Sequence, residues 1–238
     1  MEIAEPSASE RALNAARYAL SKLAPEYSAR LRLTIVQGVI GLAGLALLIE
    51  ALLGARDATL LSLEIVAFVF FAVMIAFRCA AAFSALAPPK PSAVTWSAPL
   101  PVYTILCPLY REARVLRDLA ARLGRIDYPI DRLDVKIVLE ADDAETIDAA
   151  NEIAWPSHVE LIVVPAGRPR TKPKAMNYAL TFARGDFVTV YDAEDAPDPA
   201  QLRAALDAFA AGGEDLGCVQ APLLFDNGKA GWLASQFA

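Results

Sequence analysis

Two long apolar runs near the N-terminus constrain the fold of this chain more than any other feature. The first covers residues 33–53 and the second residues 60–77, with an extension to about residue 86 if the charge of Arg78 reaches the membrane interface. Polar residues interrupt the first run at three positions, Thr34, Gln37 and Glu50. Because about 20 apolar residues in a helix cross the ~30 Å core of a bilayer, we expect two transmembrane helices. The alternative, a buried helical hairpin of a soluble protein, is disfavoured by two consecutive runs of this length.

Basic residues around these runs predict their orientation. Five precede the first run, one lies between the runs, and three follow the second. They are Arg11, Arg17, Lys22, Arg30 and Arg32, then Arg56, then Arg78, Lys90 and Arg111. The positive-inside rule therefore places both ends of the hairpin in the cytoplasm and residues 54–59 outside. We expect a multi-pass protein of the inner (cytoplasmic) membrane, with the lipid bilayer as a partner.

Composition divides the chain into four parts. Residues 1–32 form a polar, Ala-rich segment that we expect to be cytoplasmic and partly helical, and residues 33–87 hold the two spans. Residues 88–100 form a stiff, Pro-rich linker. In residues 101–238, short β-branched runs alternate with helical patterns, which predicts an α/β domain with a mainly parallel sheet and helices on both faces.

Polar clusters follow four of the expected strands in this domain. The expected strands are 102–107, 135–139, 159–164, 187–191 and 216–221, and the expected helices are 111–124, 144–155, 173–184 and 200–211. The clusters hold Tyr110 and Glu112, then Glu140 and Asp142, then Arg168, Arg170, Lys172, Lys174 and Asn177, and finally Asp192, Glu194 and Asp195. Because the carboxyl ends of strands in an open α/β sheet meet at one crevice, we expect these side chains to share a ligand site.

The residue types in these clusters suit a nucleotide diphosphate held with a metal ion. Asp192 and Glu194 are two apart on extended chain, so both carboxylates point the same way and suit a hard divalent cation, with Asp195 as the alternative second ligand. The basic loop before Asn177 supplies opposing charge for a diphosphate. Tyr110 suits stacking on a flat base. The alternative for each cluster alone is a helix cap or a solvated loop, but four successive strand ends favour a site.

Several function classes are excluded or disfavoured. The net charge of −6, without a basic stripe, argues against a nucleic-acid partner. No Gly-rich phosphate loop occurs, which argues against Rossmann dinucleotide and P-loop binding. The three cysteines have no zinc-site spacing, and Cys107 and Cys218 fall in apolar runs that predict buried free thiols.

The ordered clusters resemble the family 2 glycosyltransferases, in particular the membrane-embedded, cellulose-synthase-like branch with a GT-A fold. The resemblance covers residues 101–238. It is carried by Pro-Leu-Tyr-Arg-Glu at 108–112, Glu-Ala-Asp-Asp at 140–143, Lys-Pro-Lys-Ala-Met-Asn at 172–177 and Asp-Ala-Glu at 192–194. The resemblance implies that Tyr110 and Glu112 surround the uracil, that Glu140 or Asp142 contacts the base, and that Lys172 and Asn177 lie near the diphosphate. It also implies that Asp192 and Glu194 bind Mg²⁺ or Mn²⁺.

The resemblance implies an inverting glycosyltransferase that uses a UDP-sugar donor to extend a polysaccharide or another glycan acceptor at the membrane. Two motifs of the family are absent, the segment with the catalytic base and the Gln-x-x-Arg-Trp segment that holds the acceptor. We therefore expect a C-terminally truncated chain that is inactive alone, with the base beyond residue 238. The expected fold class is α/β, with two N-terminal transmembrane helices followed by an incomplete, Rossmann-like GT-A domain.

Two rival functions belong to other classes. One is a membrane-tethered nucleotide-sugar-binding subunit without turnover, which the missing base suits. The other is a receiver-like regulatory domain, whose acidic pocket also binds Mg²⁺. A receiver-like domain needs a lone aspartate at the end of its third strand, whereas here Val164 leads into Pro165.

Overall fold

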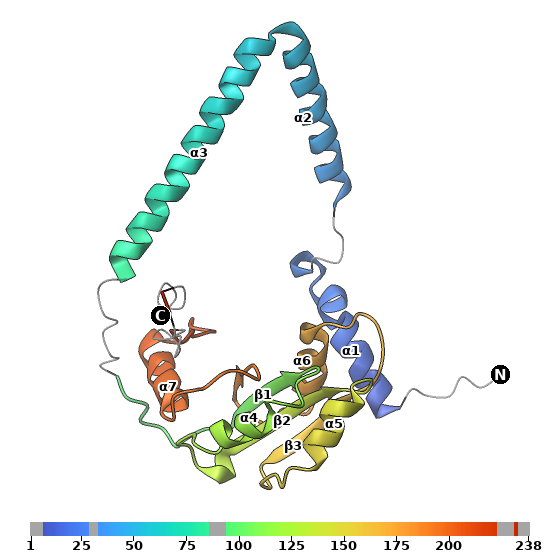
Figure 1. Ribbon diagram of the computed structural model, residues 1–238, viewed down its shortest axis with the longest axis vertical. Coiled ribbons are helices and arrows are strands. Elements are labelled where there is room, and N and C mark those ends of the chain that lie inside the picture. The colour runs from blue at the N-terminus through green and yellow to red at the C-terminus, as the bar shows by residue number, and fades with distance from the viewer. Residues whose placement is uncertain (1–6, 29–32, 86–93, 223–230, 233–238) are drawn as a thin grey trace, which may run out of the picture. The chain divides into compact units, whose positions relative to one another are not determined.

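The protein consists of two compact units, seen in a computed structural model that describes residues 7–28, 33–85, 94–222 and 231–232 (Figure 1). One unit combines Met1–Ala19 with Ser92–Ala238, and the other is Leu20–Pro91. We call them the α/β unit and the helical unit. The N-terminal residues and the C-terminal domain therefore belong to one unit, although the helical unit separates them in the sequence.

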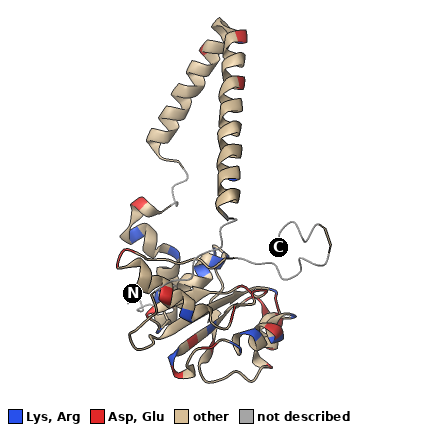
Figure 2. Cartoon of the chain, turned by 90° about the vertical axis from the view of Figure 1, so that its left-hand side faces the viewer, with Lys and Arg blue, Asp and Glu red and all other residues tan. Residues whose placement is uncertain are grey.

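The helical unit contains the two apolar helices that the sequence predicts. Helix α2 is Ile35–Gly54 and helix α3 is Arg56–Ala85, with a short 3-10 helix η1 at Pro25–Tyr27. Their most apolar stretches have a mean hydropathy of 2.1 and 2.6, and none of either stretch is buried. Thr34 caps α2 by accepting a hydrogen bond from the backbone N–H of Gln37. The helices carry few charged residues along their length (Figure 2), so both are long and apolar enough to cross a membrane.

The break between the two helices is shorter than expected. The sequence predicts a polar connection at residues 54–59, but only Ala55 separates the helices. The hydroxyl of Thr59 donates to the carbonyls of Ala51 and Ala55, at 3.0 and 2.9 Å. A hydroxyl that bonds to the backbone four residues earlier is compatible with a helix, so polar residues in this stretch do not prevent α3 from starting at Arg56.

The α/β unit is built on a parallel sheet of four strands. They are β1 (Tyr103–Leu109), β2 (Leu133–Glu140), β3 (Val159–Val164) and β4 (Phe187–Val190), in the order β3-β2-β1-β4. Every pairing in this sheet is parallel. The predicted α/β class with a mainly parallel sheet is therefore confirmed.

The prediction of a fifth strand at residues 216–221 is wrong. These residues belong to no strand, and Cys218, which we expected to be buried, is exposed. An apolar, β-branched run becomes a strand only where a neighbouring strand offers it hydrogen bonds and a face to pack on. Cys107, on the central strand β1, is buried as predicted.

The helices of the α/β unit begin or end within a few residues of their predicted positions, with one larger difference. They are α4 (Leu116–Leu123), α5 (Ala144–Asn151), α6 (Lys172–Leu180) and α7 (Gln201–Gly212). The helix expected from residue 111 begins five residues later. Arg111 has a φ of 61°, in the left-handed region that a right-handed helix excludes. The backbone N–H of Glu112 donates to the side chain of Thr146 instead of joining a helix.

Helices cover both faces of the sheet, as the βαβ alternation predicts. On one face, apolar residues of α4 and α7 pack with residues of β1 and β2, including Leu116, Leu119, Leu202, Leu206, Ile105 and Ile137. On the other face, residues of α6 pack with Leu106, Val138, Ile162 and Val164. Both cores consist of buried aliphatic and aromatic residues, so burial of apolar area is the main term that stabilises the unit.

The N-terminal helix α1 (Ala8–Leu23) completes the second face, which the sequence did not predict. Ala16 is buried in the same core as α6, and the hydroxyls of Ser9 and Tyr178 lie 3.1 Å apart. Ala12 and Leu13 are partly buried against this core. The expectation that residues 1–32 are partly helical is confirmed, and the segment up to Ala19 is in addition an integral part of the α/β unit.

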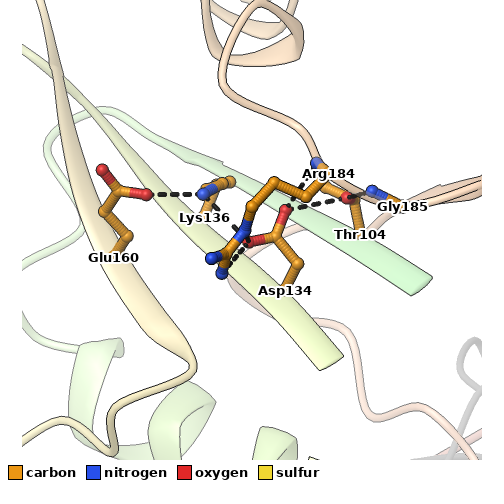
Figure 3. Close-up of polar contacts among 6 residues, drawn as sticks. All are labelled: Thr104, Asp134, Lys136, Glu160, Arg184 and Gly185. Atoms are coloured by element: carbon orange, nitrogen blue, oxygen red, sulfur yellow. Dashed lines mark hydrogen bonds and ion pairs between the residues drawn. The ribbon is translucent and has the colours of Figure 1, made fainter. Parts of the chain in front are cut away.

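A buried charged network stabilises the amino-terminal end of the sheet (Figure 3). The carboxylate of Asp134, 1% exposed, accepts hydrogen bonds from the hydroxyl of Thr104 at 2.9 Å and from Arg184 at 2.7–3.0 Å. Lys136, also 1% exposed, pairs with Asp134 at 2.9 Å and with Glu160 at 2.5 Å. Burial opposes ionisation of Asp134, but these hydrogen bonds outweigh it and lower its pKa. The network joins β1, β2, β3 and the connection before β4.

Gly185 allows the chain to pass close to this network. Its backbone N–H donates to the hydroxyl of Thr104 at 2.8 Å. A Cβ at residue 185 would lie 2.4 Å from the backbone nitrogen of Thr104 and 2.7 Å from the carbonyl oxygen of Phe187. Because both atoms belong to the backbone, only glycine fits here.

Candidate functional site

The turn after β4 carries three carboxylates, Asp192, Glu194 and Asp195. The hydrogen bonds within the turn show which of them has a structural role. The backbone N–H of Asp192 donates to the carboxylate of Asp195 at 2.8 Å, and the N–H of Asp195 donates to the carbonyl of Asp192 at 3.1 Å. Ala193 is buried between them, while Glu194 is exposed. Asp195 therefore closes the turn, which leaves Asp192 and Glu194 as the carboxylates with uncommitted oxygen atoms at this strand end.

Glu112, on the turn after β1, carries a further carboxylate with one oxygen atom that lacks a partner. Its Oε2 atom is buried and has no hydrogen-bond partner among the residues that the structure describes. Burial is the largest cause that raises its pKa, and the negative charges of Glu194 and Asp192 raise it further, while a hydrogen bond from the backbone of Tyr110 and the charge of Lys172 partly oppose them. The pKa of Glu112, at the end of β1, therefore responds to charges at the ends of β3 and β4.

Lys172 links the loop after β3 to the turn after β4. Its ammonium group forms an ion pair with the carboxylate of Asp192, and both side chains are about half exposed, at 44% and 45%. Lys172 is the first residue of α6, and Thr171 caps this helix by accepting a hydrogen bond from the N–H of Lys174. The cap fixes the start of the helix, so the local sequence places Lys172 at the edge of the sheet.

Glu140 is held in a buried ion pair at the end of β2. Its carboxylate lies 2.9 Å from the ammonium group of Lys174, and the residues are 7% and 3% exposed. The ammonium group also lies 3.4 Å from the carbonyl of Gly167. The sequence places Lys174 in a basic loop, but the structure places it in the core of the site, where it connects β2, the loop after β3 and α6.

Asp142, just after β2, also contacts the basic loop that follows β3. Its carboxylate pairs with Arg170 at 2.8 Å, and the two side chains are 24% and 59% exposed. The next residue, Asp143, is buried and caps α5 by accepting a hydrogen bond from the N–H of Thr146. The cap alternative is therefore correct for Asp143, while Asp142 is available at the surface beside Arg170.

Tyr110 stands at the rim of this edge and is 42% exposed. The guanidinium of Arg111 lies 5.2 Å from the centre of its ring, a distance typical of a cation–π contact. The backbone N–H of Arg111 donates to Asp143, which supports the left-handed conformation of this residue. Arg111 thus holds Tyr110 in place, through its contact with the ring and its hydrogen bond to Asp143.

Asn177 differs from the other predicted site residues. Its side-chain amide donates to the carbonyl of Ala16 in α1, at 3.2 Å. No described contact joins it to Lys172 or to the carboxylates. Arg17, one residue further along α1, lies close to Gly167. A Cβ atom added at Gly167 would lie 1.7 Å from a guanidinium nitrogen of Arg17. The helix α1 therefore contacts both α6 and the loop after β3.

Arg122 is a residue of this region that the sequence analysis missed. It lies in the last turn of α4 and donates to the carbonyl oxygens of Glu194 and Asp195, at 2.7 and 3.3 Å. In the sequence it occurs on the polar side of an amphipathic helix, where an arginine usually faces solvent. No sequence signal distinguishes it from its neighbours.

The donor set fits a hard divalent cation. Among the residues that the structure describes, no three His, Cys, Asp or Glu residues gather as a ready-made metal site. However, Asp192 and Glu194 present two carboxylates on the turn after β4, Lys172 pairs with Asp192, and Oε2 of Glu112 on the turn after β1 has no hydrogen-bond partner among the described residues. Carboxylate oxygens are the ligands that Mg²⁺ and Mn²⁺ prefer, and such ions often take the remaining ligands from substrate phosphates and water. Asp192 and Glu194 therefore suit a metal that binds together with a phosphorylated ligand.

The comparisons with known proteins agree on a family. The model of the family described as "Glycosyltransferase like family 2" matches residues 99–237. The chain is 28% identical over 101 residues to the probable glycosyltransferase YdaM of Bacillus subtilis, which covers 42% of this chain and 24% of YdaM. The chain thus spans about a quarter of the length of this curated relative.

Two solved structures also resemble the chain in part. One is the mannosyltransferase PcManGT from Pyrobaculum calidifontis in complex with GDP-Man and Mn²⁺, with a TM-score of 0.47, 27% identity, and coverage of 61% of this chain and 42% of that one. The other is TarS 1-349 of S. aureus in complex with UDP-GlcNAc, with a TM-score of 0.36, 21% identity, and coverage of 43% and 29%.

Proposed function

We propose a function on the premise that this chain belongs to the glycosyltransferase like family 2, because the family model covers more than half of it. We infer that it is the donor-binding part of an inverting glycosyltransferase, which transfers a sugar from a UDP-sugar to a hydroxyl group of a polysaccharide or another glycan. The observation that carries this proposal is the ion pair between Lys172, in the loop after β3, and Asp192, in the turn after β4, at the carboxyl edge of the parallel sheet. Ligands of open α/β sheets bind at this edge.

Each side chain has a role in holding the donor. The exposed ring of Tyr110 stacks on the base, and the surface carboxylate of Asp142 accepts a hydrogen bond from the base or the ribose. Glu140 acts indirectly, because its ion pair with Lys174 fixes the end of β2 and the loop that follows β3. Asn177, expected near the diphosphate, supports α6 from the side of α1 and receives no direct role.

The diphosphate binds at the turn after β4. Asp192 and Glu194 would hold Mg²⁺ or Mn²⁺, which supplies positive charge to the departing diphosphate when it is bound. Lys172 adds a further positive charge from the start of α6, so it exchanges its partner Asp192 for a phosphate oxygen as the donor enters. Glu112 lies beside this charge and keeps its partly buried carboxylate available for the donor.

The reaction is a single displacement at the anomeric carbon. The oxygen of the acceptor hydroxyl forms the new glycosidic bond while the bond to the UDP oxygen breaks, and the electron pair leaves with UDP. The hydroxyl proton passes to a base that none of the residues above supplies. The residues of this chain therefore orient the donor and stabilise the leaving group, which are positioning and electrostatic contributions.

Helix α1 supports a membrane topology in which both ends of the helical unit lie on one side. Residues up to Ala19 belong to the α/β unit, and the chain then passes through α2 and α3 before it returns to that unit at Ser92. If α2 and α3 both cross the bilayer, an even number of crossings returns the chain to the side that it left. Together with the basic residues near the spans, this supports the proposal that the α/β unit lies in the cytoplasm at the inner membrane.

The topology is tested by labelling single cysteines in intact cells with a membrane-impermeant maleimide. In a variant without the native cysteines, a cysteine in place of Asp57 is expected to react in intact cells. A cysteine in place of the exposed Asp148 in α5 is expected to react only after lysis. The opposite pattern would place the α/β unit outside and contradict the proposal.

Turnover of a UDP-sugar by the full-length gene product in detergent, with Mn²⁺ present, tests the proposed function. Asp192→Asn removes one charge from the turn and is expected to lower the rate about 100-fold or more, as expected when a group that stabilises the transition state is lost. The matched control is Asp148→Asn, at an exposed position of α5. Equal rates for Asp192→Asn and the control would refute the metal assignment. Nucleotide-sugar binding without any turnover by the unaltered full-length gene product would favour the alternative, a membrane-tethered binding subunit.

A further inference from the structure

We propose that Arg122 is a positioning residue that holds the backbone of the metal-binding turn, so that the carboxylates of Asp192 and Glu194 point at one cation. The proposal rests on the proposed function, because it concerns the same donor site. Arg122 contributes no ligand itself and contacts only backbone carbonyl groups of the turn.

The geometry at Arg122 is that of a clamp on two consecutive peptide groups. One guanidinium nitrogen, Nη1, donates to the carbonyl of Glu194 at 2.7 Å and to that of Asp195 at 3.3 Å. From the other side, the turn is closed by the carboxylate of Asp195, which accepts from the N–H of Asp192 at 2.8 Å. The peptide group between Glu194 and Asp195 is thus held twice: its carbonyl accepts from Arg122 of α4, and its N–H donates to the carbonyl of Asp192 within the turn.

A second contact anchors the segment that follows the turn to the same end of α4. The N–H of Asp127 donates to the carbonyl of Pro199 at 2.9 Å. Arg203, in the first turn of α7, donates to the carbonyl of Asp127 at 3.0 Å and pairs with its carboxylate at 3.3 Å. The residues between Glu194 and Pro199 are therefore held at both ends by the chain that leaves α4.

The chemistry of the site makes this anchoring necessary. Asp192 and Glu194 carry like charges two residues apart, so they repel each other most strongly when no cation is present. A short turn without an external anchor relieves this repulsion by rotating Glu194 toward solvent, where it is already exposed. Hydrogen bonds from a charged guanidinium to two carbonyl oxygens oppose that rotation, and a guanidinium makes such bonds better than an ammonium because its donors are fixed in one plane.

The test measures Mn²⁺ binding to the full chain in detergent by electron paramagnetic resonance, with UDP present. Arg122→Ala is expected to raise the half-saturating Mn²⁺ concentration about 5- to 30-fold, the factor that corresponds to one or two lost hydrogen bonds. Arg122→Lys, which retains one donor group, is expected to fall between Arg122→Ala and the unaltered chain. The matched control is Arg125→Ala, which removes the same charge two residues after the end of α4, where the guanidinium donates to the carbonyl of Ala121 and to no other described residue.

A kinetic measurement separates positioning from general stability. At saturating Mn²⁺, Arg122→Ala is expected to recover most of its rate, whereas a merely destabilised protein would show a lower fraction of active molecules at every Mn²⁺ concentration. Equal Mn²⁺ affinities for Arg122→Ala and Arg125→Ala would overturn the proposal. If Arg122→Ala does not fold, the same comparison is made with Arg122→Lys, for which an unchanged affinity would be the contradicting result. Binding of Mn²⁺ and UDP without sugar transfer by the unaltered full-length gene product would refute the proposed function and leave this comparison valid.

Discussion

Replacing Asp134 by asparagine tests whether the buried network at the amino-terminal end of the sheet stabilises the α/β unit. Asparagine has nearly the same shape as aspartate but carries no charge. Lys136 would remain buried, with Glu160 as its only charged partner, and the side chain of Glu160 is 55% exposed. Arg184 and Thr104 would lose a carboxylate acceptor. The substitution therefore leaves a buried positive charge without adequate compensation.

The expected loss is large because Asp134 and Lys136 are each 1% exposed. Removing one partner of a buried ion pair costs about 3–5 kcal/mol. For a domain of 150–250 residues, each kcal/mol lowers Tm by about 2–4 °C, so Asp134→Asn is expected to lower the Tm of the α/β unit by roughly 6–20 °C. The exposed Asp148→Asn is expected to change Tm by about 1–2 °C at most, since surface substitutions usually stay within ~0.5 kcal/mol.

Tryptophan fluorescence during heating measures this transition selectively. Trp96, Trp155 and Trp232 all lie outside α2 and α3, so the signal reports on the α/β unit in detergent.

The pH dependence of stability gives a second check on the role of Asp134. The pKa of Asp134 is lowered in the folded protein from its ordinary value of 3.8, so its contribution is fully present above that value and disappears as the pH falls through the lower, folded-state pKa.

The difference between the unaltered protein and Asp134→Asn should therefore be constant from pH 7 to about pH 5 and shrink below the ordinary pKa of Asp134. A variant within about 1 kcal/mol of the unaltered protein at pH 7 would show that the network contributes little. A difference that persists unchanged below pH 3 would show that the charge of Asp134 is not the cause.

The remaining predictions concern the donor site and α1. Lys174→Met alone is expected to cost about 3–5 kcal/mol, because it leaves Glu140 charged and buried, and Glu140→Gln in the same chain should restore part of that loss in denaturation measurements. Tyr110→Ala should weaken UDP binding by about 1–3 kcal/mol with little change in Tm, as measured by calorimetry, and Tyr110→Phe should bind like the unaltered chain if stacking is its role. Ala16→Asp, which places a charge in the core between α1 and α6, is expected to lower the Tm of the α/β unit, whereas the same substitution at the exposed Ala15 is not; equal effects would show that α1 is not docked in solution.

Much of the fold is predictable from the sequence because its signals are local. Strand β3 is predicted with the observed bounds, and the other three strands are predicted within a few residues, since β-branched runs bounded by turn residues leave few alternatives. The two apolar helices follow from length and hydropathy alone. The prediction of a strand at 216–221 is wrong because a strand there would need a neighbouring strand to pair with, and no local sequence pattern specifies that neighbour.

In the candidate site, too, some features follow from the sequence and others depend on tertiary packing. That the polar clusters would lie at the carboxyl edge of the sheet follows from the rule for parallel sheets, and the ion pair of Lys172 with Asp192 joins two of them there. Which lysine is buried could not be predicted. Lys172 and Lys174 are two residues apart, but Lys174 turns inward to Glu140 because α6 packs on the sheet at that position. The side of a helix that faces the core depends on tertiary packing, which a short basic run does not encode.

Helix α1 gives the helical unit a constraint that the apolar helices alone do not have. The contacts of Ala16 and Asn177 place the segment before α2 on the same unit as the segment after α3. If α2 and α3 cross a bilayer as proposed, they must cross it in opposite directions, because the chain enters and leaves them from the same α/β unit. The docking of α1 would then couple insertion of the two helices to folding of the α/β unit. It also brings α6, the helix that begins with Lys172, into direct contact with the segment that leads to the first span.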